Sequence, residues 1–118
     1  MPTQIATVRA VAADLAARAD FDLDAVSDLR MAVDEVCSTL ATLARPGSRL
    51  HCTLRVDPDR ITVIARIPKP EYSMISQNTF GWQVLATLTD KVEIIAEHDS
   101  DTPSLGIQLV KMRPGITA

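Results

Sequence analysis

The spacing of apolar residues predicts two helices at the start of the chain. Residues 4–19 are rich in Ala and place apolar side chains three and four residues apart, the spacing of one helix face. Acidic residues between Asp20 and Asp28 then precede a second periodic segment, as a helix N-terminus favours. Its apolar residues also share one face: Leu29, Val33, Val36, Leu40 and Leu43. Pro46 and Gly47 end this helix.

The rest of the chain mostly alternates between apolar and polar residues, which predicts strands joined by turns and one further helix. The predicted elements are strands at 49–56 and 61–67, a helix within 79–90, and strands at 91–98 and 105–112. Strand pairs joined by short turns indicate an antiparallel or mixed sheet with helices on one face. The expected fold class is therefore α+β, a two-layer sandwich with a mostly antiparallel sheet.

Composition narrows the possible functions. The chain has 118 residues, with 47% apolar and only 3% aromatic residues, so one aliphatic core is expected. A net charge of −3 argues against nucleic-acid binding.

We find neither an apolar run long enough for a membrane span nor a signal peptide. Cys37 and Cys52 fit buried, reduced thiols. A soluble, cytoplasmic protein is expected.

No metal site is predicted. The acidic run that starts at Asp20 could be mistaken for a calcium loop, but its sixth and twelfth positions hold Ala25 and Met31 instead of Gly and Glu. Helix capping explains these acidic residues better. His51 and His98 have no second ligand at metal-binding spacing.

One strip of the second predicted helix carries polar side chains beside the apolar face. At about 100° per residue, Asp28, Ala32, Glu35 and Thr39 line this strip, whereas Asp34 points toward solvent. A carboxylate and a hydroxyl one turn apart can border a cleft between helix and sheet. Spacing alone favours a solvated helix flank, with the cleft as the alternative.

Two separated stretches resemble one protein family. "DFDLDAVSDLRMAVDEVCSTLATLA" (20–44) is similar to the second-helix region of the anti-sigma factor/serine kinases of the RsbW and SpoIIAB type. The likeness is stronger still to the mycobacterial anti-sigma-F proteins. "TFGWQVLATLTDKVEI" (79–94) and the closing "LGIQLVKMR" (105–113) resemble the same family in the same order. The resemblance covers nearly the whole chain.

The resemblance implies the Bergerat ATP-binding fold of histidine kinases and gyrase-type ATPases. In the wider family a Glu-x-x-x-Asn signature lies on the second helix; the Glu is the general base toward a partner serine, and the Asn holds the magnesium on ATP. Here the signature runs from Glu35 to Thr39. The resemblance thus implies Glu35 as the candidate general base, and Thr39 as a shorter hydroxyl in place of the Asn.

The family's other nucleotide-binding elements are changed in this chain. Where an Asp-x-Gly-x-Gly segment should follow the strand at 61–67, the sequence has "PKPEY". The glycine-rich lid and helix start, where phosphates meet backbone amides, is reduced to Gly81. The closing strand keeps Gly106 but has Ile107 where a Thr is expected. We therefore expect a degenerate site with no cofactor, and ATP with magnesium only if the chain is still a kinase.

The leading interpretation is an anti-sigma factor that sequesters an alternative, stress-response sigma factor and is released by partner switching with an anti-anti-sigma protein. Serine kinase activity is expected to be weak or lost. The alternatives are an active ATP-dependent serine kinase that phosphorylates the anti-anti-sigma protein, and a small structural or dimerisation module. The polar side of the first helix, with Arg9, Asp14 and Arg18, is the predicted contact with the sigma factor.

The chain is expected to form a single anti-sigma/kinase-like domain over residues 1–118. The family usually begins with a strand before the first helix, whereas here the helical pattern starts almost at Met1. That first strand is therefore expected to be missing. Because it can contribute to the family's dimer, a homodimer stays an open alternative.

Overall fold

The centre of the fold is one antiparallel sheet with the strand order β1-β2-β4-β3. The computed structural model describes residues 2–18, 21–68, 75–97 and 103–113. The strands are β1 (His51–Val56), β2 (Arg60–Pro68), β3 (Lys91–Glu97) and β4 (Ser104–Met112). β1 and β2 form a hairpin, and β4 lies between β2 and β3. The two long strands β2 and β4 are therefore the central pair.

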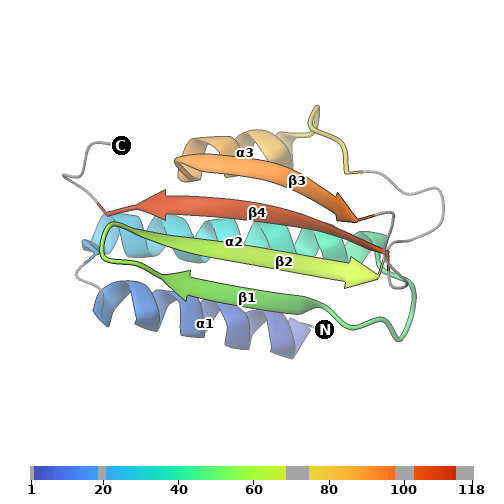
Figure 1. Ribbon diagram of the computed structural model, residues 1–118, viewed down its shortest axis with the longest axis horizontal. Helices are drawn as coiled ribbons and strands as arrows, with labels where there is room; N and C mark the ends of the chain where they lie inside the picture. The colour runs from blue at the N-terminus through green and yellow to red at the C-terminus, as the bar shows by residue number, and fades with distance from the viewer. Residues whose placement is uncertain (1, 19–20, 69–74, 98–102, 114–118) are drawn as a thin grey trace.

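Three helices cover one face of this sheet (Figure 1). They are α1 (Pro2–Arg18), α2 (Leu23–Leu43) and α3 (Phe80–Leu88). α2 begins after Asp22, whose carboxylate accepts a hydrogen bond from the backbone N–H of Ala25 at 2.8 Å. This bond satisfies one of the free N–H groups at the helix start. None of the helices in the described parts of the chain is both long and apolar enough to cross a membrane.

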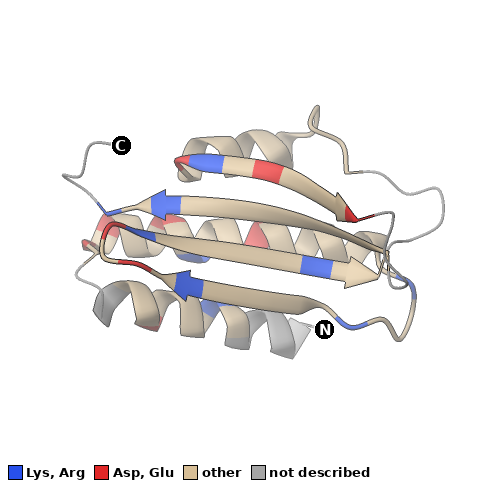
Figure 2. Cartoon of the chain, viewed as in Figure 1, with Lys and Arg blue, Asp and Glu red and all other residues tan. Residues whose placement is uncertain are grey.

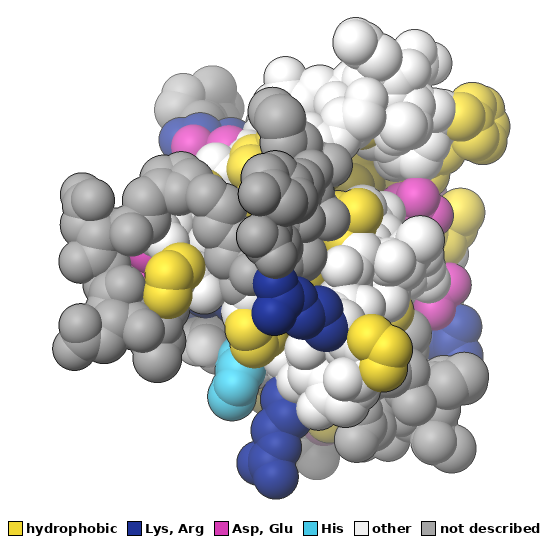
Figure 3. Space-filling view, turned by 90° about the vertical axis from the view of Figure 1, so that its right-hand side faces the viewer, with side chains coloured by type: hydrophobic (Ala, Val, Ile, Leu, Met, Phe, Trp, Pro, Cys, Tyr) yellow, Lys and Arg dark blue, Asp and Glu magenta, His cyan; other side chains and the backbone are white. Residues whose placement is uncertain are grey.

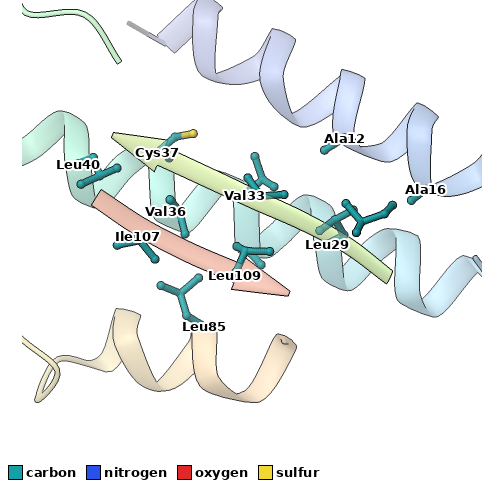
Figure 4. Close-up of a cluster of buried hydrophobic side chains, with 14 of the residues drawn as sticks. Ala12, Ala16, Leu29, Val33, Val36, Cys37, Leu40, Leu85, Ile107 and Leu109 are labelled. Carbon is teal, nitrogen blue, oxygen red and sulfur yellow. The ribbon is translucent and has the colours of Figure 1, made fainter. Parts of the chain in front are cut away.

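The core lies between the helices and the sheet. On β2, every second side chain is buried: Ile61, Val63, Ala65 and Ile67. On α2, the buried residues follow the helical period: Ala25, Leu29, Ala32, Val33, Val36, Cys37 and Leu40. Figure 4 shows Leu85 of α3 and Ile107 of β4 meeting α2 in this core. The predicted α+β two-layer sandwich is confirmed.

On the other face of the sheet the described residues form no helix, and we call it the open face. Its side chains include cross-strand pairs such as Thr53 with Ile64 and Gln108 with Glu93, and Figure 2 shows both charge types on the strands. Val56 lies on the same side of β1 as the half-buried Cys52 and Leu54 but is 42% exposed. It ends an edge strand just before the hairpin turn, where no helix covers it.

Candidate functional site

A pocket of about 330 Å³ lies between the C-terminal half of α2 and the start of α3. Figure 1 shows both helix ends on the same side of the molecule, and Figure 3 views that side. The pocket is lined by Glu35, Thr39, Thr42, Leu43, Ile75, Ser76, Thr79 and Gly81. Thus Gly81 of α3 meets Glu35 and Thr39 of α2, although it lies far from them in the sequence.

The polar strip of α2 places Glu35 and Thr39 at this pocket. Ala32, one turn before Glu35, is fully buried, while Glu35 and Thr39 are half-buried. The strip therefore runs along the contact between α2 and α3 and ends at a cleft. Glu35 and Thr39 therefore border a cleft, as the alternative interpretation had it, and the solvated flank that spacing alone favoured does not describe them.

The start of α3 is held by its own cap. The hydroxyl of Thr79 accepts a hydrogen bond from the backbone N–H of Trp82 at 3.1 Å. Gly81, in the first turn, lies directly against the carboxylate of Glu35. A Cβ atom at position 81 would clash with Glu35 Oε1 and would lie 3.1 Å from its Cδ. The missing side chain of Gly81 thus lets the Glu35 carboxylate reach the N-terminal end of α3.

The opposite end of α3 meets a cation. The ammonium group of Lys111 donates a hydrogen bond to the carbonyl of Leu88 at 2.9 Å and lies 3.2 Å from Asp28 Oδ2. A helix carries partial positive charge at its N-terminus and partial negative charge at its C-terminus. Glu35 and Lys111 therefore complement the two ends of α3, and Asp28 joins this arrangement from α2.

Hydroxyl groups supply most of the remaining polarity of the pocket. The Thr42 hydroxyl donates its proton to the carbonyl of Ser38 at 2.9 Å, a common arrangement inside helices. The Ser76 hydroxyl accepts a hydrogen bond from the backbone N–H of Asn78 at 3.2 Å. The lone pairs of Thr42 are consequently left to accept hydrogen bonds from a ligand.

Glu35 is the one charged residue that lines the pocket within the described part of the chain, and no Lys or Arg lines it there. No described residue forms a hydrogen bond or an ion pair with the side chain of Glu35. No group of three His, Cys, Asp or Glu residues that could hold a metal occurs in the residues searched. The pocket is therefore weakly anionic, and its hydroxyls differ: Thr42 can only accept from a ligand, whereas Ser76 and Thr79 keep a proton to donate.

Cys37 lies two residues after Glu35 but belongs to the core. It is fully buried, and burial raises the pKa of its thiol to about 12, with smaller contributions from Cys52 and Asp34. Because only the thiolate is an effective nucleophile, this neutral thiol is a packing residue.

The other predicted site residues lie elsewhere. Gly106 is on β4, and a Cβ there would clash with the carbonyl oxygen of Ala65 and lie 2.9 Å from Arg66 Cγ. It is not among the residues that line the pocket. Its neighbour Ile107 is fully buried in the core. Gly106 instead leaves space for Arg66, whose guanidinium forms an ion pair with Glu97 of β3 at 3.0 Å.

The three residues predicted to contact a partner are on α1. Arg9 lies 3.7 Å from Asp34 of α2, with both side chains substantially exposed. Asp14 is exposed. Arg18 is the last residue of α1, and its side chain lies outside the described residues. Contact of α1 with a sigma factor remains a prediction.

Sequence reasoning missed five of the lining residues: Thr42, Leu43, Ile75, Ser76 and Thr79. Thr42 follows Thr39 by one turn on the same helix face, and this spacing could have identified it. Thr79 precedes an apolar helical run, as N-cap residues do. Ile75 and Ser76 lie in the segment before α3, where no periodic pattern exists to indicate a direction.

The sequence that builds this fold and pocket matches a known protein family. The sequence model of the histidine kinase-like ATPase domain matches residues 1–111, and the chain belongs to this family. Within it, the chain is 33% identical over 101 residues to the anti-sigma-F factor RsbW of Mycobacterium tuberculosis, in strains CDC 1551 / Oshkosh and ATCC 25618 / H37Rv. The match covers 86% of this chain and 59% of each relative. The resemblance to the RsbW and SpoIIAB type is thereby confirmed, and the chain matches somewhat over half the length of these relatives.

Proposed function

We propose that this chain is an anti-sigma factor whose nucleotide pocket no longer serves ATP. It sequesters an alternative sigma factor of the stress-response kind in the cytoplasm and keeps it from RNA polymerase. Similarity to proteins named anti-sigma-F factor supports the regulatory role. The observation that carries the loss of nucleotide binding is the pocket itself, where Glu35 is the one charged lining residue within the described chain.

A triphosphate does not fit these residues. Phosphate groups are held by cationic side chains, metal ions and the backbone N–H groups at a helix start. Here no described Lys or Arg lines the pocket, and the helix start that could receive phosphate lies against the carboxylate of Glu35. Bringing phosphates to this place would put like charges in contact. Thr39 offers magnesium only a single short hydroxyl.

The adenine side of the site is also altered. β2 ends at Pro68, and the segment after it lacks the Asp and the glycines of the family pattern. Ile107, in the place where the family has a Thr, is part of the apolar core and offers no hydrogen bond to a base. The adenine end of a nucleotide therefore lacks the Asp and Thr partners of the family pattern. The phosphate end meets hydroxyls and a carboxylate among the described lining residues, but no cationic side chain.

Release of the sigma factor then depends on competition between proteins. Without phosphate transfer, an anti-anti-sigma protein would displace the sigma factor by its own binding energy. The polar side of α1, with Arg9, Asp14 and Arg18, is the proposed contact with the sigma factor. Exchanging the charges of Asp14 and Arg18 should weaken sigma binding but leave the thermal midpoint nearly unchanged.

Two measurements test the proposed function. The purified chain should retain a candidate alternative sigma factor in a pull-down, whereas calorimetric titration with ATP and magnesium should show no binding. Failure to retain any candidate sigma factor would favour a structural or dimerisation module. Micromolar ATP binding, together with phosphate transfer to an anti-anti-sigma serine that Glu35→Gln abolishes, would establish the kinase alternative instead.

A further inference from the structure

We infer that the pocket between α2 and α3 receives a positively charged side chain, an Arg or Lys of a protein partner, in the place where the family binds nucleotide. This inference rests on the proposed loss of nucleotide binding. A cationic side chain is the class of ligand that the pocket would bind in place of nucleotide. Three features of the described residues carry it: an unmatched carboxylate, oriented acceptors, and an apolar wall with an exposed aromatic neighbour.

The carboxylate of Glu35 is the first feature. Its neighbours on α2 are matched, since Asp34 lies 3.7 Å from Arg9 and Asp28 lies 3.2 Å from Lys111. Glu35 has no such partner among the described residues. The N-terminus of α3 supplies only a partial positive charge, so the Glu35 carboxylate lacks a full counter-charge among the described residues. A cationic ligand would supply this counter-charge to Glu35.

Hydrogen-bond acceptors are the second feature. Because Thr42 donates its proton to the carbonyl of Ser38, its oxygen can only accept from a ligand. An ionised carboxylate likewise only accepts. A guanidinium group has five N–H donors and an ammonium group has three, and neither has an acceptor. Both groups therefore suit Glu35 and Thr42 better than a phosphate does.

The apolar part of the site is the third feature, and it favours a side chain of a protein. Leu43 and Ile75 line the pocket beside its polar groups, and they suit the aliphatic stem of an Arg or Lys. Phe80 is next to Gly81 and is 81% exposed. Exposed aromatic residues are typical anchors of protein interfaces. Phe80 does not line the pocket, but it offers a protein partner an exposed aromatic side chain at the same helix start.

The test uses the whole chain and a simple probe, N-acetyl-arginine methylamide, with its neutral analogue N-acetyl-citrulline methylamide as the chemical control. Amide chemical shifts are followed by NMR at millimolar probe concentrations. The arginine probe should move the signals of Thr39, Thr79 and Gly81 in a saturable way, and the citrulline probe should not. Shifts centred elsewhere, or equal shifts with both probes, would overturn the inference.

Two neighbouring substitutions make the test specific. Glu35→Gln and Asp34→Asn remove the same charge from adjacent positions, so both change the long-range field equally. Glu35→Gln should weaken arginine binding about tenfold, and Asp34→Asn should change it less than about twofold. Equal effects of both substitutions would show general attraction without a pocket, and would also overturn the inference.

Titration of the parent chain with ATP and magnesium separates the proposed loss of nucleotide binding from the inferred binding of a cationic side chain. Nucleotide binding at the same amides would contradict the proposed function. Absence of arginine binding, with nucleotide also absent, would contradict only the present inference. Circular dichroism of both variants confirms that they are folded, because each position is partly exposed on a helix that its apolar face holds in place.

Discussion

At the scale of single residues, two glycines show how different causes select the same residue type. A Cβ at Gly81 would meet the far end of the Glu35 side chain, whereas a Cβ at Gly106 would meet the backbone carbonyl of Ala65. A side-chain end can rotate away, but the backbone of a central strand cannot. The first glycine therefore positions a functional group, and the second permits sheet packing.

This difference predicts unequal costs for the same substitution at the two positions. Gly81→Ala should change the free energy of unfolding by less than about 1 kcal/mol, because the helix propensity of Ala offsets the displacement of Glu35. Gly106→Ala should cost about 1–3 kcal/mol, as overpacking does. Urea denaturation of both variants gives these values. A destabilised Gly81→Ala variant together with an unaffected Gly106→Ala variant would reverse the assignment.

A second residue-scale prediction concerns Cys37. Its thiol has an ordinary pKa of 9.0, which burial raises to about 12 in the folded chain. The folded state therefore holds the proton more tightly than the unfolded state. The contribution to stability is full below pH 9.0 and decreases by about 1.4 kcal/mol per pH unit as pH rises toward 12.

The measurement is the free energy of unfolding between about pH 8 and pH 11 for the parent chain and for Cys37→Ala. Other groups titrate in this range in both proteins, so the difference between the two slopes isolates Cys37. The variant should be less stable at neutral pH, because it loses buried volume, but should lose less stability on the alkaline side. Parallel curves would exclude the thiol as the cause.

At the scale of elements, the sequence was most informative where one face of an element is buried. The seven predicted elements all occur, and their ends differ from the observed ends by a few residues. Periodicity predicted the buried face of α2, because a helix that packs on a core needs apolar residues along the side that is buried. Alternation alone does not indicate how deeply each residue of a strand is buried, as the exposed Val56 at the end of β1 shows. The polar strip indicated the α2 side of the pocket and the family resemblance indicated Gly81, whereas Ile75 and Ser76 follow no sequence pattern that would place them there.

The buried face of α2 yields a third prediction. Leu40 is fully buried, and Met31 of the same helix is 54% exposed. Leu40→Ala should reduce the free energy of unfolding by about 2–5 kcal/mol, because it removes packed methyl groups and leaves a cavity. Met31→Ala, the matched control, should stay within about 0.5 kcal/mol. Chemical denaturation measures both, and similar costs would mean that the helix packs by another face.

At the scale of the whole molecule, a ligand that binds only the folded state must stabilise it. Binding at one thousand times the dissociation constant adds about 4 kcal/mol to the free energy of unfolding. We therefore predict that millimolar ATP with magnesium leaves the thermal midpoint of this chain unchanged. A chain of similar fold with an intact nucleotide site serves as the positive control. A rise of several degrees would show that nucleotide still binds.

Trp82 is the only tryptophan of the chain, and it lies in the first turn of α3, where its backbone N–H bonds to Thr79. Its side chain packs partly against the core, one residue away from Gly81 and the carboxylate of Glu35. The emission of this one indole therefore reports on a single place, the helix start beside the pocket. The protein carries its own fluorescent probe, and capture of a partner at this end can be followed optically without any label.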